Sequence, residues 1–137
     1  MVKHLVRSGC PASKIVLGIP AYGRQLQNPS SVRTISELID HAISTKGEDG
    51  QWTWQDVGGR KGNNHKRGDE EYAYDDTSDV IDKVKAASRL GLAGVFLWEV
   101  GQDFRGTGGD PGGVLLRSIR DTVSSFAVAS GGSNEEL

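Results

Sequence analysis

The sequence predicts an α/β fold, and two apolar runs carry this prediction. Residues 14–19 read Lys-Ile-Val-Leu-Gly-Ile, and residues 93–99 read Ala-Gly-Val-Phe-Leu-Trp-Glu. Continuous apolar runs of this length are typical of strands buried on both faces of a parallel sheet. A helical pattern precedes each run, and aromatic and charged residues follow or end it. Because ligands bind at the carboxyl ends of parallel strands, we expect a binding site there.

The first elements follow from local patterns. Val2, Leu5 and Val6 share one face of a predicted helix, which Gly9 ends before strand 15–19. Residues 25–33 are polar, and we expect them to be irregular.

A second helix is expected after that irregular stretch. Residues 34–37 form the capping-box pattern Thr-x-x-Glu, and apolar residues at helical spacing continue to Gly47. Within residues 51–55 and 71–74, aromatic residues then recur with period two, so each aromatic pair lies on one face of a strand. These two segments predict an antiparallel hairpin with a long polar loop over 58–70.

The remaining pattern returns to helix, strand and helix. Asp76 or Thr77 can cap a helix whose apolar face ends at Gly91, just before strand 93–99. A last helix carries apolar residues from Leu115 to Phe126, and residues 129–137 are expected to form a disordered tail. The order predicts two α/β units with a small α+β module, about residues 25–74, inserted after the first strand.

Composition limits the class of function. The chain has 137 residues, a net charge of -2 and 25% charged residues, which argues against a dedicated nucleic-acid-binding protein. The single Cys10 excludes an internal disulfide, and the three histidines lack metal-ligand spacing, so we expect neither metal nor cofactor. The sequence has neither an apolar span of about 18 residues, which a transmembrane helix needs, nor a signal peptide at its start.

Two ordered motifs resemble family 18 of the glycoside hydrolases, the chitinase family. Residues 15–24 (IVLGIPAYGR) resemble that family's seventh strand. Residues 74–76 (YDD), the helix after them and residues 91–99 (GLAGVFLWE) resemble its seventh helix and eighth strand. The resemblance implies that residues 1–128 are the carboxyl-terminal part of a (β/α)8 TIM barrel. A whole barrel needs about 250 residues, so we expect the remainder upstream and, as in the family, an extracellular location.

The resemblance also implies a substrate site for chitin or chito-oligosaccharides. Trp98 would form the floor of the sugar site, while Tyr22 and Arg24 would line the cleft and bind N-acetylglucosamine. Each has a structural alternative: Trp98 as a core residue, Tyr22 as the close of its strand, and Arg24 as the partner of an acidic neighbour. Trp52 and Trp54 either extend the sugar-binding wall or form the core of the inserted module.

The catalytic signature of the family is absent from these residues. The chain holds no Asp-x-x-Asp-x-Asp-x-Glu run, and Asp75 and Asp76 fit a helix start better than a catalytic pair. If Trp98 faces the cleft, Glu99 faces the helix layer, because successive strand residues alternate. We therefore expect no catalytic residue and no hydrolysis by this chain alone. The alternatives are a non-catalytic, lectin-like chitin-binding module and an orphan structural fragment without ligand.

Overall fold

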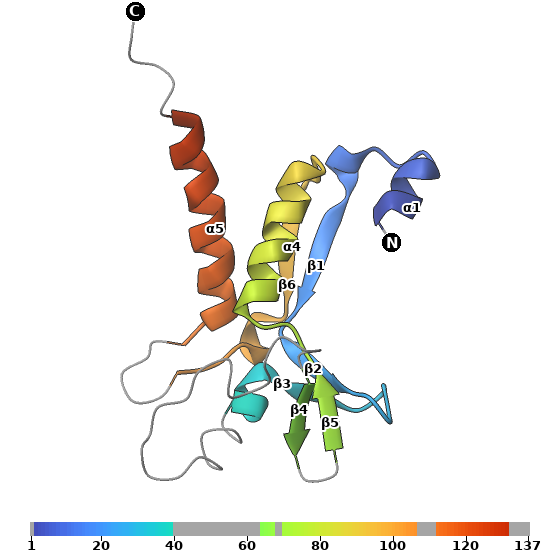
Figure 1. The fold of residues 1–137 in the computed structure, drawn as a ribbon, viewed down its shortest axis with the longest axis vertical. Coiled ribbons are helices and arrows are strands. Elements are labelled where there is room, and N and C mark those ends of the chain that lie inside the picture. Colours follow the sequence, from blue (N-terminus) through green and yellow to red (C-terminus); the bar gives the residue numbers. More distant parts are fainter. Residues whose placement is uncertain (1, 40–63, 68–69, 107–111, 132–137) are drawn as a thin grey trace, which may run out of the picture.

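The computed structural model describes residues 2–39, 64–67, 70–106 and 112–131 (Figure 1). Its helices and strands are, in chain order, α1 (Val2–Arg7), β1 (Val16–Pro20), β2 (Tyr22–Gln25), β3 (Val32–Thr34), β4 (Asn64–Arg67), β5 (Glu70–Ala73), α4 (Thr77–Arg89), β6 (Gly94–Trp98) and α5 (Val114–Gly131). Single 3-10 turns cover Ala12–Lys14 and Val100–Gln102, and residues 35–39 are helical.

The strands form two separate sheets. β1 and β6 pair in parallel, with Val16 opposite Gly94 and Pro20 opposite Trp98. The second sheet is antiparallel and has the order β3-β2-β5-β4. The chain leaves the first sheet after Pro20 and enters the second at Tyr22, so the second sheet begins at the carboxyl end of β1. The α/β prediction is confirmed, including the parallel pairing of the two apolar runs.

α4 covers one face of the parallel pair, and α5 packs against α4 (Figure 1). As expected, Asp76 caps α4: the amide of Asp79 donates to its carboxylate at 2.9 Å, and its own amide donates to the Asp79 carboxylate at 3.1 Å. The helix ends at Arg89, and the positive φ of 63° at Gly91 lets Leu92 donate to the carbonyl of Ala87.

The core lies between the parallel strands, α4, α5 and the second sheet. Its buried members are Ile19, Ala21, Ile35, Leu38, Ile39, Tyr72, Tyr74, Val80, Val84, Phe104 and Leu115. The predicted capping box begins the helical segment 35–39, because the Glu37 amide donates to the Thr34 hydroxyl at 3.0 Å. The Glu37 carboxylate in turn accepts from the Thr34 amide at 2.8 Å. These two local hydrogen bonds fix the start of the helical segment.

The second sheet corrects two predictions of irregular structure. β3 occupies part of the stretch 25–33, because Val32 and Thr34 are β-branched and the segment pairs with β2. β4 lies within the predicted loop 58–70 and pairs with β5. Its sequence, Asn-His-Lys-Arg, has no apolar alternation, so only the tertiary pairing defines it as a strand. Residues 51–55, the other half of the predicted hairpin, and Gly47 lie outside the described residues.

The parallel strands are not buried on both faces, so that prediction is wrong for the described residues. Val95 and Leu97 pack against the core, whereas Phe96 and Trp98 alternate to the opposite face and are 47% and 61% exposed. No described helix covers that face. α5 also continues to Gly131, past the expected start of the tail at Ala129, because adding a residue to an existing helix costs little. Among the described residues, no helix is long and apolar enough to cross a membrane.

Candidate binding site

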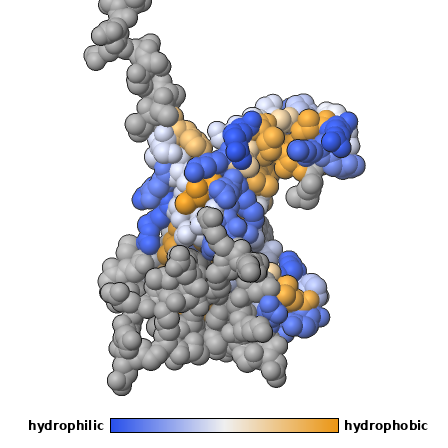
Figure 2. All heavy atoms as spheres, viewed as in Figure 1, coloured by the Kyte–Doolittle hydropathy of each residue, from blue (hydrophilic) through white to orange (hydrophobic). Residues whose placement is uncertain are grey.

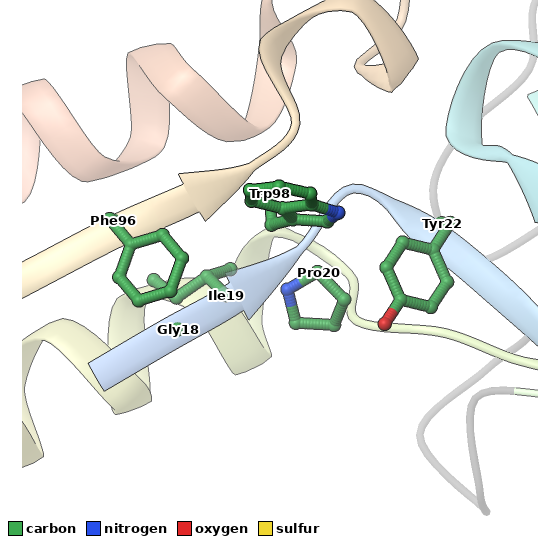
Figure 3. Close-up of a pocket in the computed structure, with 6 residues that line it drawn as sticks. All are labelled: Gly18, Ile19, Pro20, Tyr22, Phe96 and Trp98. Carbon is green, nitrogen blue, oxygen red and sulfur yellow. The ribbon is translucent and has the colours of Figure 1, made fainter. Parts of the chain in front are cut away.

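An open pocket of about 470 Å³ lies at the carboxyl ends of β1 and β6 (Figure 3). Its lining residues are Gly18, Ile19, Pro20, Tyr22, Phe96 and Trp98. The lining is almost entirely apolar, and the parallel strands supply five of its six members. The pocket therefore sits where the fold class predicts a ligand site.

Trp98 is the last residue of β6 and presents its indole to this pocket. Its backbone carbonyl accepts a hydrogen bond from the Ala21 amide at 2.8 Å, which ties the end of β6 to the end of β1. The peptide bond between Trp98 and Glu99 is cis. The Trp98 side chain is 61% exposed over the described residues, so nothing in this part of the chain covers the indole.

Phe96 forms the other end of the pocket, and sequence reasoning missed it. Gly18 lies directly opposite Phe96 in the register of the parallel pair. A side chain at Gly18 would meet the tip of the Phe96 ring at 3.0 Å, so the ring lies across the glycine. The available signal was the period of two, since Phe96 and Trp98 share one face of the strand.

Tyr22 lines the pocket from the second sheet, and Arg24 supports it from behind. The Arg24 guanidinium donates to the Tyr22 hydroxyl at 3.3 Å and lies 5.5 Å from the centre of the Tyr22 ring. It also donates to the carbonyl of Pro29, so its described partners are not the acidic neighbour of the structural alternative. Because the Tyr22 hydroxyl accepts from Arg24, its own proton remains available for a ligand. The structure thus brings Trp98 and Tyr22 together, with Arg24 outside the lining.

Among the residues that the structure describes, none that lines the pocket carries a carboxylate. Glu99 follows Trp98 but does not line the pocket, and its carbonyl accepts from the Gln102 amide at 2.9 Å. Asp75 forms an ion pair with Lys83, and Asp76 caps α4, so both serve the helix. In the part of the chain that the structure describes, no group of three or more metal-ligating side chains is arranged around one point. Trp52 and Trp54 lie outside the described residues.

The arrangement suits a flat ligand with apolar faces and a polar rim. The indole nitrogen of Trp98 and the ring of Tyr22 lie at one end of the pocket, and Phe96 lies at the other (Figure 3). The aromatic faces can pack against C–H groups, while the indole N–H and the phenol O–H can donate hydrogen bonds. Sugar rings combine these properties.

The described residues thus define an α/β protein with an open aromatic pocket at the carboxyl ends of its parallel strands. The model of the family "Glycosyl hydrolases family 18" matches residues 1–103. The chain therefore belongs to family 18 of the glycosyl hydrolases.

The curated relatives are more than twice as long as this chain. The chain is 34% identical over 111 residues to a class V chitinase of Arabidopsis thaliana, which covers 72% of this chain and 29% of that protein. It is 32% identical over 119 residues to endochitinase 1 of Metarhizium anisopliae, covering 77% of this chain and 27% of that protein. The chain thus spans less than a third of these relatives.

Solved structures show the same fold. A family 18 chitinase of Cycas revoluta in complex with allosamidin matches 89% of this chain and 37% of its own, with a TM-score of 0.66 and 22% identity. A chitinase-like agglutinin of Robinia pseudoacacia matches 88% of this chain and 35% of its own, with a TM-score of 0.58 and 24% identity. The path of the chain over the described residues is therefore that of chitinases and of chitinase-like proteins.

Proposed function

We propose that this chain forms the substrate-binding, carboxyl-terminal part of a chitinase-like barrel that acts on chitin or N-acetylglucosamine oligosaccharides. The exposed indole of Trp98, set between Phe96 and Tyr22 at the carboxyl end of β6, is the observation that supports it. Among solved relatives of the same fold, the Cycas revoluta chitinase was crystallised with (GlcNAc)4. In this proposal the remaining strands of the barrel come from residues upstream of Met1.

The proposed binding mode uses each described side chain for one task. The face of a sugar ring packs on Trp98, and the adjacent apolar surface of Phe96 accepts a substituent with a methyl group, such as an acetamido group. The Tyr22 hydroxyl, held by Arg24, and the Trp98 indole N–H donate to oxygens at the other end. This division favours a sugar with both an apolar substituent and several oxygens.

For hydrolysis we assign the proton donor to the same upstream residues. Family 18 uses a substrate-assisted route, in which the acetamido oxygen of the substrate replaces a second enzymatic carboxylate. One acid must still protonate the leaving oxygen. The described pocket has no carboxylate in its lining, so the role left to this chain is to hold the sugar and orient its acetamido group.

The same observation supports a second candidate, a non-catalytic sugar-binding protein. Human YKL-39, whose structure matches 90% of this chain at a TM-score of 0.62, is a pseudo-chitinase with retained chitooligosaccharide binding. The two candidates differ upstream of Met1. An in-frame Asp-x-x-Asp-x-Asp-x-Glu run there supports the enzyme, and a degraded run supports the lectin-like protein.

The experiment is a calorimetric titration of this chain together with the upstream residues that complete its barrel, with the trisaccharide of N-acetylglucosamine as the ligand. The matched control is cellotriose, which has the same ring and linkage but carries a hydroxyl in place of each acetamido group. We expect saturable binding of the first sugar and at least about tenfold weaker binding of the second, equivalent to about 1.4 kcal/mol. Equal binding of both, or none of either, would contradict the proposal.

A further inference from the structure

A buried carboxylate lies five residues after Trp98 and belongs to none of the roles assigned so far. Asp103 is 3% exposed. Its carboxylate accepts hydrogen bonds from the backbone amides of Phe104 at 2.7 Å, Leu115 at 3.2 Å and Leu116 at 3.0 Å. The last two amides belong to the first turn of α5. Asp103 therefore ties the segment after β6 to the start of a helix more than ten positions further along the chain.

The surrounding backbone is closely packed at this junction. The Gly113 amide donates to the Phe104 carbonyl at 2.7 Å. A Cβ atom on Gly112 would lie 2.5 Å from the carbonyl carbon of Arg105, so the two segments are in direct backbone contact. Phe104 itself is buried in the core. The junction therefore has a fixed geometry with the Asp103 carboxylate at its centre.

Short hydrogen-bonded turns connect this junction to Trp98. The Asp103 amide donates to the Val100 carbonyl at 3.2 Å, and the Gln102 amide donates to the Glu99 carbonyl at 2.9 Å. On the other side, the carbonyl of Trp98 accepts from Ala21. The backbone at Trp98 is thus held by β1 from one side and by the turn that Asp103 fixes from the other.

We propose that Asp103 is a positioning residue for Trp98 in the sugar site. The indole is mostly exposed, so side-chain packing supplies little of its orientation, and the backbone at positions 98 and 99 must supply the rest. Loss of the Asp103 carboxylate frees the turn after β6 and lets the indole leave its place beside Phe96 and Tyr22. This inference rests on the proposed function in one respect only: sugar is the ligand for which Trp98 is positioned.

The test follows the fluorescence of Trp98 itself. Trp52→Phe with Trp54→Phe leaves Trp98 as the only tryptophan of the chain. In this parent we introduce Asp103→Asn, which keeps the volume and one acceptor oxygen. The readouts are the anisotropy and acrylamide quenching of Trp98 at submicromolar concentration, and the affinity for the N-acetylglucosamine trisaccharide. We expect lower anisotropy, stronger quenching and a loss of affinity of roughly threefold to tenfold.

The matched control is Asp76→Asn, which weakens a buried helix cap on α4 whose carboxylate accepts from the Asp79 amide. Its Trp98 fluorescence and affinity should match the parent even where its thermal midpoint falls. If Asp103→Asn also lowers the midpoint but leaves Trp98 fluorescence unchanged in the folded chain, Asp103 is only a helix cap, and the proposal is overturned. If the unsubstituted protein binds no sugar, the proposed function fails, while the fluorescence comparison still decides the role of Asp103.

A second variant covers the case in which Asp103→Asn does not fold. Leu116 is exposed and is the third residue of α5, where the backbone amide has no partner within the helix. Leu116→Pro removes one amide donor from the Asp103 carboxylate and leaves the carboxylate in place. We expect a smaller change in Trp98 anisotropy in the same direction. No change in a folded Leu116→Pro chain would equally overturn the proposal.

Discussion

The indole of Trp98 contributes little to the core, since it lies on the face of β6 opposite the buried side chains of Val95 and Leu97. Its position is explained if a ligand packs against it. Function and stability are therefore separable at this residue, and one substitution can test the first without losing the second.

Trp98→Ala should weaken sugar binding while leaving the fold intact. A stacking aromatic is worth about 1–3 kcal/mol by analogy with base stacking, so we expect an affinity loss of about tenfold or more. The free energy of unfolding should change by less than about 0.5 kcal/mol, as for other exposed positions. Val123→Ala, an exposed apolar residue on α5, is the matched control. Unchanged affinity in a Trp98→Ala chain with a normal circular dichroism spectrum would contradict the assignment.

The buried phenol of Tyr74 should make the protein less stable at alkaline pH. Burial, and next the charges of Asp76 and Asp79, raise the pKa of Tyr74 well above its ordinary value of 10.0. A folded-state pKa above the unfolded value stabilises the protein fully below pH 10.0, and this contribution is lost as the pH rises through the folded value. The free energy of unfolding of Tyr74→Phe should therefore differ from that of the wild type by a constant amount up to about pH 9. Above pH 10 the wild type should lose stability relative to Tyr74→Phe. Urea unfolding at both pH values measures this; parallel curves throughout would refute it.

At the scale of elements, α4 connects the inserted module to β6, and its first turn depends on Asp76. Asp76→Ala removes the acceptor of the Asp79 amide and should lower the free energy of unfolding by about 0.5–2 kcal/mol. Asp76→Asn keeps an acceptor and should cost less. Urea unfolding followed by circular dichroism gives both values. Equal stability of the wild type and Asp76→Ala would show that the second sheet alone fixes the start of α4.

The sequence predicts those elements whose pattern is local. The apolar runs of β1 and β6 and the capping residues Thr34 and Asp76 each carry their signal within a few residues. β4 carries none, because its strand conformation comes from pairing with β5. The site residues differ in the same way, because some have a local sequence signal and others do not. Trp98 and Tyr22 belong to recognisable sequence motifs, whereas Phe96 has the same local pattern as any apolar strand residue. Asp103 accepts from helix amides 12 and 13 residues away, which no local pattern predicts.

At the scale of the whole molecule, the parallel sheet has two open edges. Among the described strands, β1 and β6 pair only with each other, and their outer face exposes Val16, Phe96 and Trp98. Figure 2 shows a further apolar patch near α1, where Val2, Val6, Ala12 and Leu90 line a groove of about 360 Å³. Unpaired edges and apolar faces together favour association.

The isolated chain should therefore be oligomeric or aggregation-prone. A two-stranded sheet with free edges offers backbone donors and acceptors to other chains, and a pair this small has little stability of its own. Multi-angle light scattering after size exclusion, over a tenfold range of concentration, measures the mass. A monodisperse monomer with cooperative unfolding at the highest concentration would show that these residues fold as an autonomous domain.

The isolated chain should also fail to hydrolyse chitin derivatives. The described pocket has no carboxylate in its lining, and Glu99 lies outside it. A fluorogenic chitobioside assay should give turnover at background level. The informative control is Glu99→Gln. Activity above background that this substitution abolishes would make Glu99 the acid and would reverse the orientation assigned to the end of β6.

The second sheet begins and ends at nearly the same point. β2, with which the chain enters it, pairs with β5, with which the chain leaves it, and Arg24 stands opposite Ala73. Backbones paired in this way are about 5 Å apart, so a short turn could connect β2 directly to β5. A homologous segment that keeps the buried packing of Ile35, Leu38 and Tyr72 could therefore replace this sheet without moving the parallel strands. Tyr22 belongs to the second sheet, whereas Phe96 and Trp98 belong to β6. Such a replacement would therefore change the hydrogen-bonding group of the pocket and leave its two other aromatic side chains in place.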